Sequence, residues 1–92
     1  MKDELYALLL KIPKGRVTTY KSLAQKLNTK AYRHIGTLLS QNKDLVRIPC
    51  HRVVRSDGCV GEYAGGASMK KKLLMQEGVS IENGKVAQRF FV

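Results

Sequence analysis

The stretch TTYKSLAQKLNTKAYRHIGTLLSQN, residues 18–42, predicts two short helices joined by a tight polar turn. The first helix is expected from about Tyr20 to Leu27, with either Thr18 or Thr19 as its N-cap. The second is expected from about Ala31 to Gln41. Two helices with so short a connection are typical of a helix-turn-helix. The apolar face of the second helix consists of Ile35, Leu38 and Leu39.

One further helix is predicted on each side of this pair. Residues 3–12 carry apolar side chains at the i, i+3, i+4 and i+7 spacing of one helix face, and Pro13 and Gly15 end that helix. A last helix is expected over residues 68–77, where Gly78 is suited to its C-terminal end. The sequence therefore predicts a mainly α domain.

The segment between the helix-turn-helix pair and the last helix changes to an extended pattern. Apolar residues at 45–49 and 53–54 precede an Asp57-Gly58 turn and Cys59-Val60, which predicts a hairpin or wing. An Asn83-Gly84 turn predicts a second hairpin near the carboxyl terminus. The expected fold is thus a winged helix-turn-helix with a small β hairpin.

The length of the chain indicates how many domains it holds, and its net charge indicates the class of partner. A chain of 92 residues holds one modest core, so we expect a single domain over residues 1–92. Seventeen Lys and Arg against seven Asp and Glu give a net charge of +10, which attracts polyanions. Lys30, Arg33 and His34 lie at the start of the second helix of the pair, where such a protein touches DNA. Nucleic acid is therefore the expected partner.

An anionic membrane is the alternative partner for so basic a chain. No apolar run approaches the roughly 18 residues of a membrane span, and no secretion signal is recognisable. The sequence therefore favours a soluble, intracellular protein without a membrane partner, cytoplasmic and associated with nucleoid or nuclear DNA.

The two cysteines, Cys50 and Cys59, allow one disulfide. A basic chain without an export signal is expected in a reducing compartment, however, and this favours free thiols. Cys59 matches no functional pattern and is expected to be structural. His34 and His51 are not spaced with the cysteines as zinc ligands, so we expect no metal and no cofactor.

The segment Ile48-Pro49-Cys50-His51-Arg52-Val53 carries the most chemistry. A thiol is a strong nucleophile only as thiolate, and nearby His, Arg or Lys side chains lower its pKa. Neighbours in a strand point to opposite faces, however, so a buried Cys beside a surface His and Arg is an alternative interpretation.

Pro49 to Val53 resembles the active-site signature of the O6-alkylguanine-DNA alkyltransferases, also called methylated-DNA–protein-cysteine methyltransferases. The resemblance runs from about Leu5 to Ile81 and includes residues 17–23, 63–66 and 73–78. It implies an enzyme that binds the minor groove of double-stranded DNA as a monomer and flips O6-alkylguanine into a pocket. The alkyl group then passes irreversibly to Cys50, once per chain.

The resemblance also assigns roles to residues around the acceptor. It implies that His51 takes the thiol proton through a water and that Glu77 orients and charge-balances this histidine. Asn42 would brace the bend between the recognition helix and the active-site strand, and Tyr20 would donate a hydrogen bond to the guanine ring.

A second group of residues is implied to bind DNA or the base. Arg33 would fill the space that the flipped base leaves, Tyr63 would lie near O6, and the carbonyl of Val53, like that of the acceptor cysteine, would accept from the exocyclic amine. Ala64 stands where several relatives have a hydroxyl residue that helps to hold O6. The remaining residues implied at the DNA or base are Arg52 and Gly65.

The sequence also departs from the family, because nothing in it corresponds to the N-terminal domain of many relatives. Two other functions stay open. One is a lesion-binding protein without chemistry, similar to the alkyltransferase-like proteins, which commonly carry tryptophan in place of the acceptor cysteine. The other is a winged-helix DNA-binding regulator, which a buried and unreactive Cys50 would favour.

Overall fold

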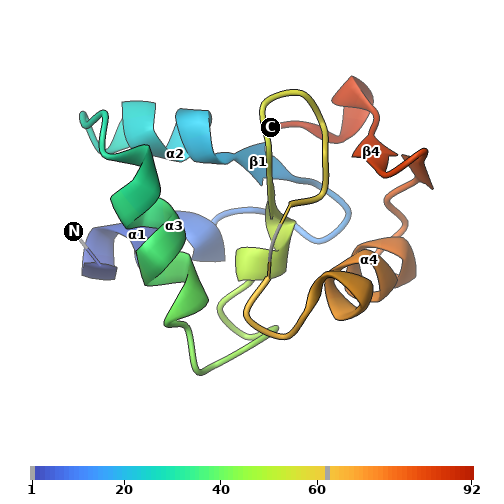
Figure 1. Ribbon diagram of the computed structural model, residues 1–92, viewed down its shortest axis with the longest axis horizontal. Helices are drawn as coiled ribbons and strands as arrows, with labels where there is room; N and C mark the ends of the chain where they lie inside the picture. Colours follow the sequence, from blue (N-terminus) through green and yellow to red (C-terminus); the bar gives the residue numbers. More distant parts are fainter. Residues whose placement is uncertain (1, 62) are drawn as a thin grey trace.

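The computed structural model describes residues 2–61 and 63–92. Figure 1 shows α1, α2 and α3 grouped on one side, α4 and the carboxyl-terminal segment on the other, and β1 between them. The elements in chain order are α1 (Lys2–Leu10), β1 (Thr18–Thr19), α2 (Tyr20–Lys26), α3 (Tyr32–Ser40), the 3₁₀ turn η1 (Cys50–Arg52), β2 (Val53–Val54), α4 (Ala67–Gln76), β3 (Ile81–Glu82), β4 (Lys85–Val86) and the 3₁₀ turn η2 (Gln88–Phe90). Among these residues, no helix has the length and apolar character needed to cross a membrane.

The predicted pair of helices is confirmed as α2 and α3. Thr19 is the N-cap of α2, because its Oγ1 accepts a hydrogen bond from the Ser22 amide at 2.9 Å. Between the helices Asn28 has a φ of 55°, a left-handed conformation that asparagine tolerates better than most residues. The tight connection packs α2 against α3.

The strand pairing differs from the sequence prediction. β2 pairs in parallel with β1, so that Thr18 lies opposite Val53 and Thr19 opposite Val54. We expected 53–54 to pair with 59–60, and that prediction was wrong, although the tight turn forms and the Arg55 amide donates to the Cys59 carbonyl at 2.9 Å. The three residues before β2 were expected to be extended and instead form η1. A strand of two residues has no periodicity by which sequence analysis could find it.

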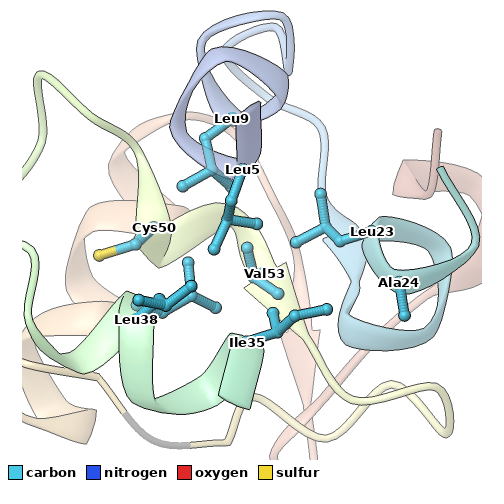
Figure 2. Close-up of a cluster of buried hydrophobic side chains, with 9 residues drawn as sticks. Leu5, Leu9, Leu23, Ala24, Ile35, Leu38, Cys50 and Val53 are labelled. Atoms are coloured by element: carbon cyan, nitrogen blue, oxygen red, sulfur yellow. The ribbon is translucent and has the colours of Figure 1, made fainter. Parts of the chain in front are cut away.

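The parallel pair connects the two halves of the molecule. β1 leads directly into α2, and β2 follows the turn that holds Cys50, so the pairing brings these segments together. One apolar cluster lies on the helix-turn-helix side, and in Figure 2 the Cys50 sulfur points away from the centre of this cluster. Its buried members are Leu5, Leu9, Leu23, Ala24, Ile35, Leu38, Leu39, Cys50 and Val53.

The carboxyl-terminal segment completes a second apolar cluster. The predicted helix end at Gly78 is confirmed: its φ is 93°, and the Val79 amide donates to the Leu74 carbonyl at 3.0 Å. The predicted Asn83-Gly84 hairpin forms between β3 and β4. The chain then returns to β1, where the Val92 amide donates to the Val17 carbonyl at 2.9 Å. The buried members of this cluster are Val17, Val54, Val60, Leu74, Val79 and Val86.

Candidate active site

An open pocket lies where α3, the Cys50 turn and the loop before α4 meet. Its volume is about 690 Å³, within the range of small-molecule sites. Several of the site residues expected from the sequence line this one pocket, although they come from distant parts of the chain. They are Tyr20, Arg33, Cys50, Tyr63 and Ala64.

One face of α3 forms a wall that the sequence analysis missed. Arg33, Gly36, Thr37 and Ser40 line the pocket, and they follow the i, i+3, i+4 and i+7 spacing of a single helix face. A Cβ on Gly36 would have no atom within 4 Å, so the wall is open at this position. The signal was present in the sequence, because this small and polar face lies beside the apolar face that packs into the core.

Cys50 is a buried free thiol held by Asn42. The Asn42 amide nitrogen donates to the Ile48 carbonyl at 2.8 Å and to Cys50 Sγ at 3.3 Å, while its oxygen accepts from the Asp44 amide. Burial raises the pKa of Cys50 above its ordinary value, and the hydrogen bond from Asn42 and the charge of Lys70 offset only part of this effect. The sulfur is therefore a thiol at neutral pH and needs a base.

His51 does not line the pocket, and its side chain contacts Glu77 at the end of α4. Its Nε2 lies 3.1 Å from Glu77 Oε2, and its side chain is fully buried. Burial lowers the pKa of His51 below its ordinary value, although Glu77 favours the charged form. Burial alone would raise the pKa of Glu77, but hydrogen bonds from Arg52 and His51 outweigh it and lower that pKa. At neutral pH the pair is thus a neutral imidazole beside a carboxylate.

This arrangement fixes which nitrogen of His51 can act as a base. A carboxylate only accepts hydrogen bonds, so Nε2 carries the ring proton and donates a hydrogen bond to Glu77. Nδ1 is then an acceptor, and it is buried with no hydrogen-bond partner among the described residues. The free lone pair therefore belongs to Nδ1.

Arg52 lies away from the pocket. Its guanidinium binds both carboxylate oxygens of Glu77 at 3.0 and 2.7 Å, and a third nitrogen donates to the Ile12 carbonyl at 2.7 Å. We expected Arg52 at the DNA or the base, but its side chain is only 14% exposed. The arginine therefore ties the end of α4 to the segment after α1.

Tyr63 brings a buried hydroxyl to the pocket. Burial and then the charge of Cys50 raise the pKa of Tyr63 to about 12, so the hydroxyl keeps its proton, and it has no partner among the described residues. The ring meets His51 edge to face at 6.3 Å between centroids. A Cβ on Gly65 would lie 2.8 Å from the Tyr63 ring, so glycine is needed there to seat the tyrosine.

Lys70 is a buried residue that the sequence analysis missed. It is 0% exposed, and its Nζ donates to the Val53 carbonyl at 2.6 Å. The Val53 carbonyl, expected to bind a guanine amine, therefore already accepts a hydrogen bond from this lysine. The sequence did contain a signal, because Lys70 and Leu74 lie on one face of α4 and the C-cap residue Glu77 continues their i, i+4, i+7 spacing.

The structure thus separates the expected site residues into those that line the pocket and those that do not. Outside the lining are Asn42, which donates to the thiol, the hydrogen-bonded group of His51, Arg52 and Glu77, and also Val53 and Gly65. Cys50 and Cys59 are both free. Within residues 2–61 and 63–92, no three His, Cys, Asp or Glu side chains are grouped as metal ligands.

Known proteins share this fold and sequence. A methylated-DNA–protein-cysteine methyltransferase from Pyrobaculum aerophilum is 51% identical over 76 residues, which cover 83% of this chain and 51% of that protein. The O6-methylguanine-DNA methyltransferase structure from Pyrococcus kodakaraensis matches with a TM-score of 0.78 and 40% identity, over 85% of this chain and 46% of that one. S. pombe Atl1, in complex with damaged DNA containing O6-carboxymethylguanine, matches with a TM-score of 0.85 and 25% identity, over 99% of this chain and 93% of that one.

These matches confirm the mainly α helix-turn-helix fold and the resemblance drawn from the Cys50 segment. The chain spans about half the length, or less, of the curated relatives that it matches. The family model of the 6-O-methylguanine DNA methyltransferase DNA-binding domain covers residues 1–79. The chain therefore belongs to the family of 6-O-methylguanine DNA methyltransferase DNA-binding domains.

Proposed function

We propose that this chain repairs DNA by taking an alkyl group from O6 of a guanine onto Sγ of Cys50. The basic domain binds double-stranded DNA through the minor groove, in the compartment that holds the cell's DNA, and the damaged base leaves the stack to enter the pocket. Arg33 occupies the space left in the duplex, and Tyr63 lies near O6. The chain acts as a monomer and needs no cofactor.

One arrangement carries this proposal. A buried free thiol lines an open pocket, and two buried polar atoms lack a hydrogen-bond partner among the described residues, one on the residue after the thiol and one on another residue of the pocket lining. They are Nδ1 of His51 and the hydroxyl of Tyr63. Each unpaired buried polar group costs about 1–3 kcal/mol, so keeping two of them on these residues needs a reason other than folding. Alkyl transfer supplies that reason, because it needs a proton acceptor for sulfur and a donor to O6.

The proposed step balances in atoms and protons. The S–C bond of the alkylated cysteine forms as the C–O6 bond breaks. The thiol proton passes through a water to Nδ1 of His51, and the Tyr20 hydroxyl gives its proton to the ring of the leaving guanine. The proton on His51 then returns through water to the tyrosinate, so that the thiol proton is replaced on Tyr20 and the base leaves neutral. Glu77 stabilises the imidazolium that forms. A thioether is stable in water, so each chain reacts once.

Intact-mass measurement tests the proposal. After mixing with a duplex that contains O6-methylguanine, each chain should gain one methyl group, and peptide mapping should place it on Cys50. Cys50→Ala should abolish the gain while leaving affinity for the duplex largely in place, because the basic surface remains. Methylation that persists in Cys50→Ala, or maps to Cys59, would refute the proposal.

Lesion binding without chemistry is the second candidate. The observation that favours it is the match to S. pombe Atl1, whose chain is covered to 93%. The same mass experiment separates the two functions. A parent chain that binds the modified duplex tightly and stays unmethylated would be a lesion-binding protein.

A further inference from the structure

Arg55 is a pocket residue to which neither the fold nor the proposed chemistry gives a task. It follows β2 directly, its side chain is exposed, and it lines the same pocket as Cys50 and Arg33. Both backbone groups of Arg55 are hydrogen-bonded. Its amide donates to the Cys59 carbonyl at 2.9 Å, and its carbonyl accepts from the Gly58 amide at 2.9 Å. The side chain therefore starts from an ordered turn.

The strand register brings Arg55 next to Tyr20. Thr19 lies opposite Val54 in a parallel pair, so Tyr20 and Arg55 leave the pair at the same end. Gly61 lies against both of them. A Cβ on Gly61 would be 3.4 Å from Arg55 Cγ and 3.7 Å from the Tyr20 hydroxyl oxygen. Tyr20 is half-buried and Arg55 exposed, so Arg55 is the outer of the two.

The Arg55 guanidinium is available for a ligand of opposite charge. Other arginines are engaged: Arg47 pairs with Asp44, and Arg52 pairs with Glu77. Among the described residues, no hydrogen bond or ion pair joins the Arg55 guanidinium to another side chain. Its charge helps to lower the pKa of Asp57, an exposed carboxyl that already accepts from the Cys59 amide.

We infer that Arg55 binds the backbone phosphate of the nucleotide whose base occupies the pocket. The inference rests on the proposed function and adds the contact that holds the extruded nucleotide. A base inside the pocket remains joined through its sugar to phosphates at the rim, outside the Tyr20 hydroxyl. Arginine binds a phosphate through paired, charge-assisted hydrogen bonds. Arg55 is the exposed cation at that position.

This role differs from that proposed for Arg33. Arg33 replaces a base inside the duplex, so its effect should require a double strand. The phosphate that Arg55 holds exists in a single strand as well, and only the free base lacks it. A duplex, a single strand and the free base, compared as substrates, therefore distinguish the role of Arg55 from that of Arg33.

The test measures the single-turnover alkylation rate by intact mass, with the substrate at a lower concentration than the protein. Three substrates are compared: a duplex with O6-methylguanine, the modified strand alone, and the free base. Arg55→Gln should lower the rate on both DNA substrates about tenfold, and at least about fivefold more than on the free base. Arg33→Ala should lower it mainly on the duplex. Arg47→Gln is the matched control, since Arg47 is 84% exposed and outside the pocket lining.

Two outcomes would overturn the inference. An equal loss on all three substrates would mean that Arg55 acts on the base, and no loss on any would mean that it is a solvated side chain. A second measurement is independent of chemistry: in a Cys50→Ala background, Arg55→Gln should reduce the salt dependence of binding to the lesion duplex by about one phosphate contact. A parent that no substrate alkylates would refute the proposed function, and an unchanged salt dependence would refute the role of Arg55.

Discussion

The reactivity of Cys50 depends on where two neighbouring side chains point. His51 and Arg52 follow it in sequence, yet both turn to Glu77, at 3.1 and 2.7 Å. The sulfur is left with the Asn42 amide and a pKa above its ordinary value. The expectation that adjacent cations lower the thiol pKa therefore fails here. Under the proposed function, activation comes from proton transfer to a neutral imidazole whose charged form Glu77 stabilises.

Replacing Glu77 by Gln should slow transfer and weaken the fold together. The imidazolium loses its counter-charge, so we expect a transfer rate lower by roughly tenfold or more. Arg52 loses a buried ion-pair partner, so we expect the free energy of unfolding to fall by about 3 kcal/mol. Single-turnover kinetics and urea unfolding measure the two effects.

Glu82→Gln is the matched control, because Glu82 is an exposed acid on β3. Affinity for DNA should stay within about twofold in both variants, since neither acid binds phosphate. A transfer rate that Glu77→Gln leaves unchanged would mean that this acid only anchors Arg52, and that the thiol is activated by another group.

Among the elements, β1 is short but connects more of the molecule than its length suggests. Its two residues pair with β2 on one side, and the preceding Val17 bridges to Phe91 on the other. Thr19 also caps α2, so one residue serves both the sheet and the helix. Thr18 is different: it is 1% exposed, and its hydroxyl has no hydrogen-bond partner among the described residues.

Thr18→Val should therefore stabilise the protein. Valine keeps the β-branched shape and removes a buried hydroxyl without a partner, so we expect a gain of about 1 kcal/mol and a Tm higher by about 4–8 °C. Thr19→Ala, which removes the cap, should cost about 1 kcal/mol. Thermal unfolding of both variants checks the pair. A lower Tm for Thr18→Val would show that the hydroxyl is hydrogen-bonded in solution.

The whole molecule combines a net charge of +10 with one fully buried neutral histidine. Burial lowers the pKa of His51 from its ordinary 6.5 in the folded state. The unfolded chain therefore binds more protons just below pH 6.5, and stability falls as the pH falls through that range. The pKa of Glu77 is also lowered in the folded state, from its ordinary value of 4.5. Protonation of this carboxylate therefore removes further stability as the pH falls below 4.5.

Acidification should thus destabilise the chain before ordinary carboxylates titrate. We expect the free energy of unfolding to be lower at pH 5.5 than at pH 7.5 by about 1 kcal/mol, measured by urea unfolding at constant ionic strength. His34→Gln should keep this dependence, because His34 is exposed. His51→Gln should flatten it, and a flat profile in the parent would contradict a neutral buried His51.

Local signals predicted the helices, whereas the resemblance to the alkyltransferases supplied five of the residues that line the pocket. Periodic apolar residues and the caps at Thr19 and Gly78 are short-range features, so α2, α3 and α4 followed from sequence. The pairing of Thr18 with Val53 did not, because it depends on contacts between distant segments. Arg52 was misplaced for a related reason: its sequence position says nothing about side-chain direction.

The buried amine of Lys70 has a practical consequence for labelling. Its Nζ is held by the Val53 carbonyl and shielded from solvent, so acylating reagents that modify surface lysines should not reach it. Modification at this one site then requires α4 to separate from β2. The rate at which Lys70 becomes acylated, relative to exposed Lys71 on the same helix, therefore measures how fast α4 and β2 separate around Cys50.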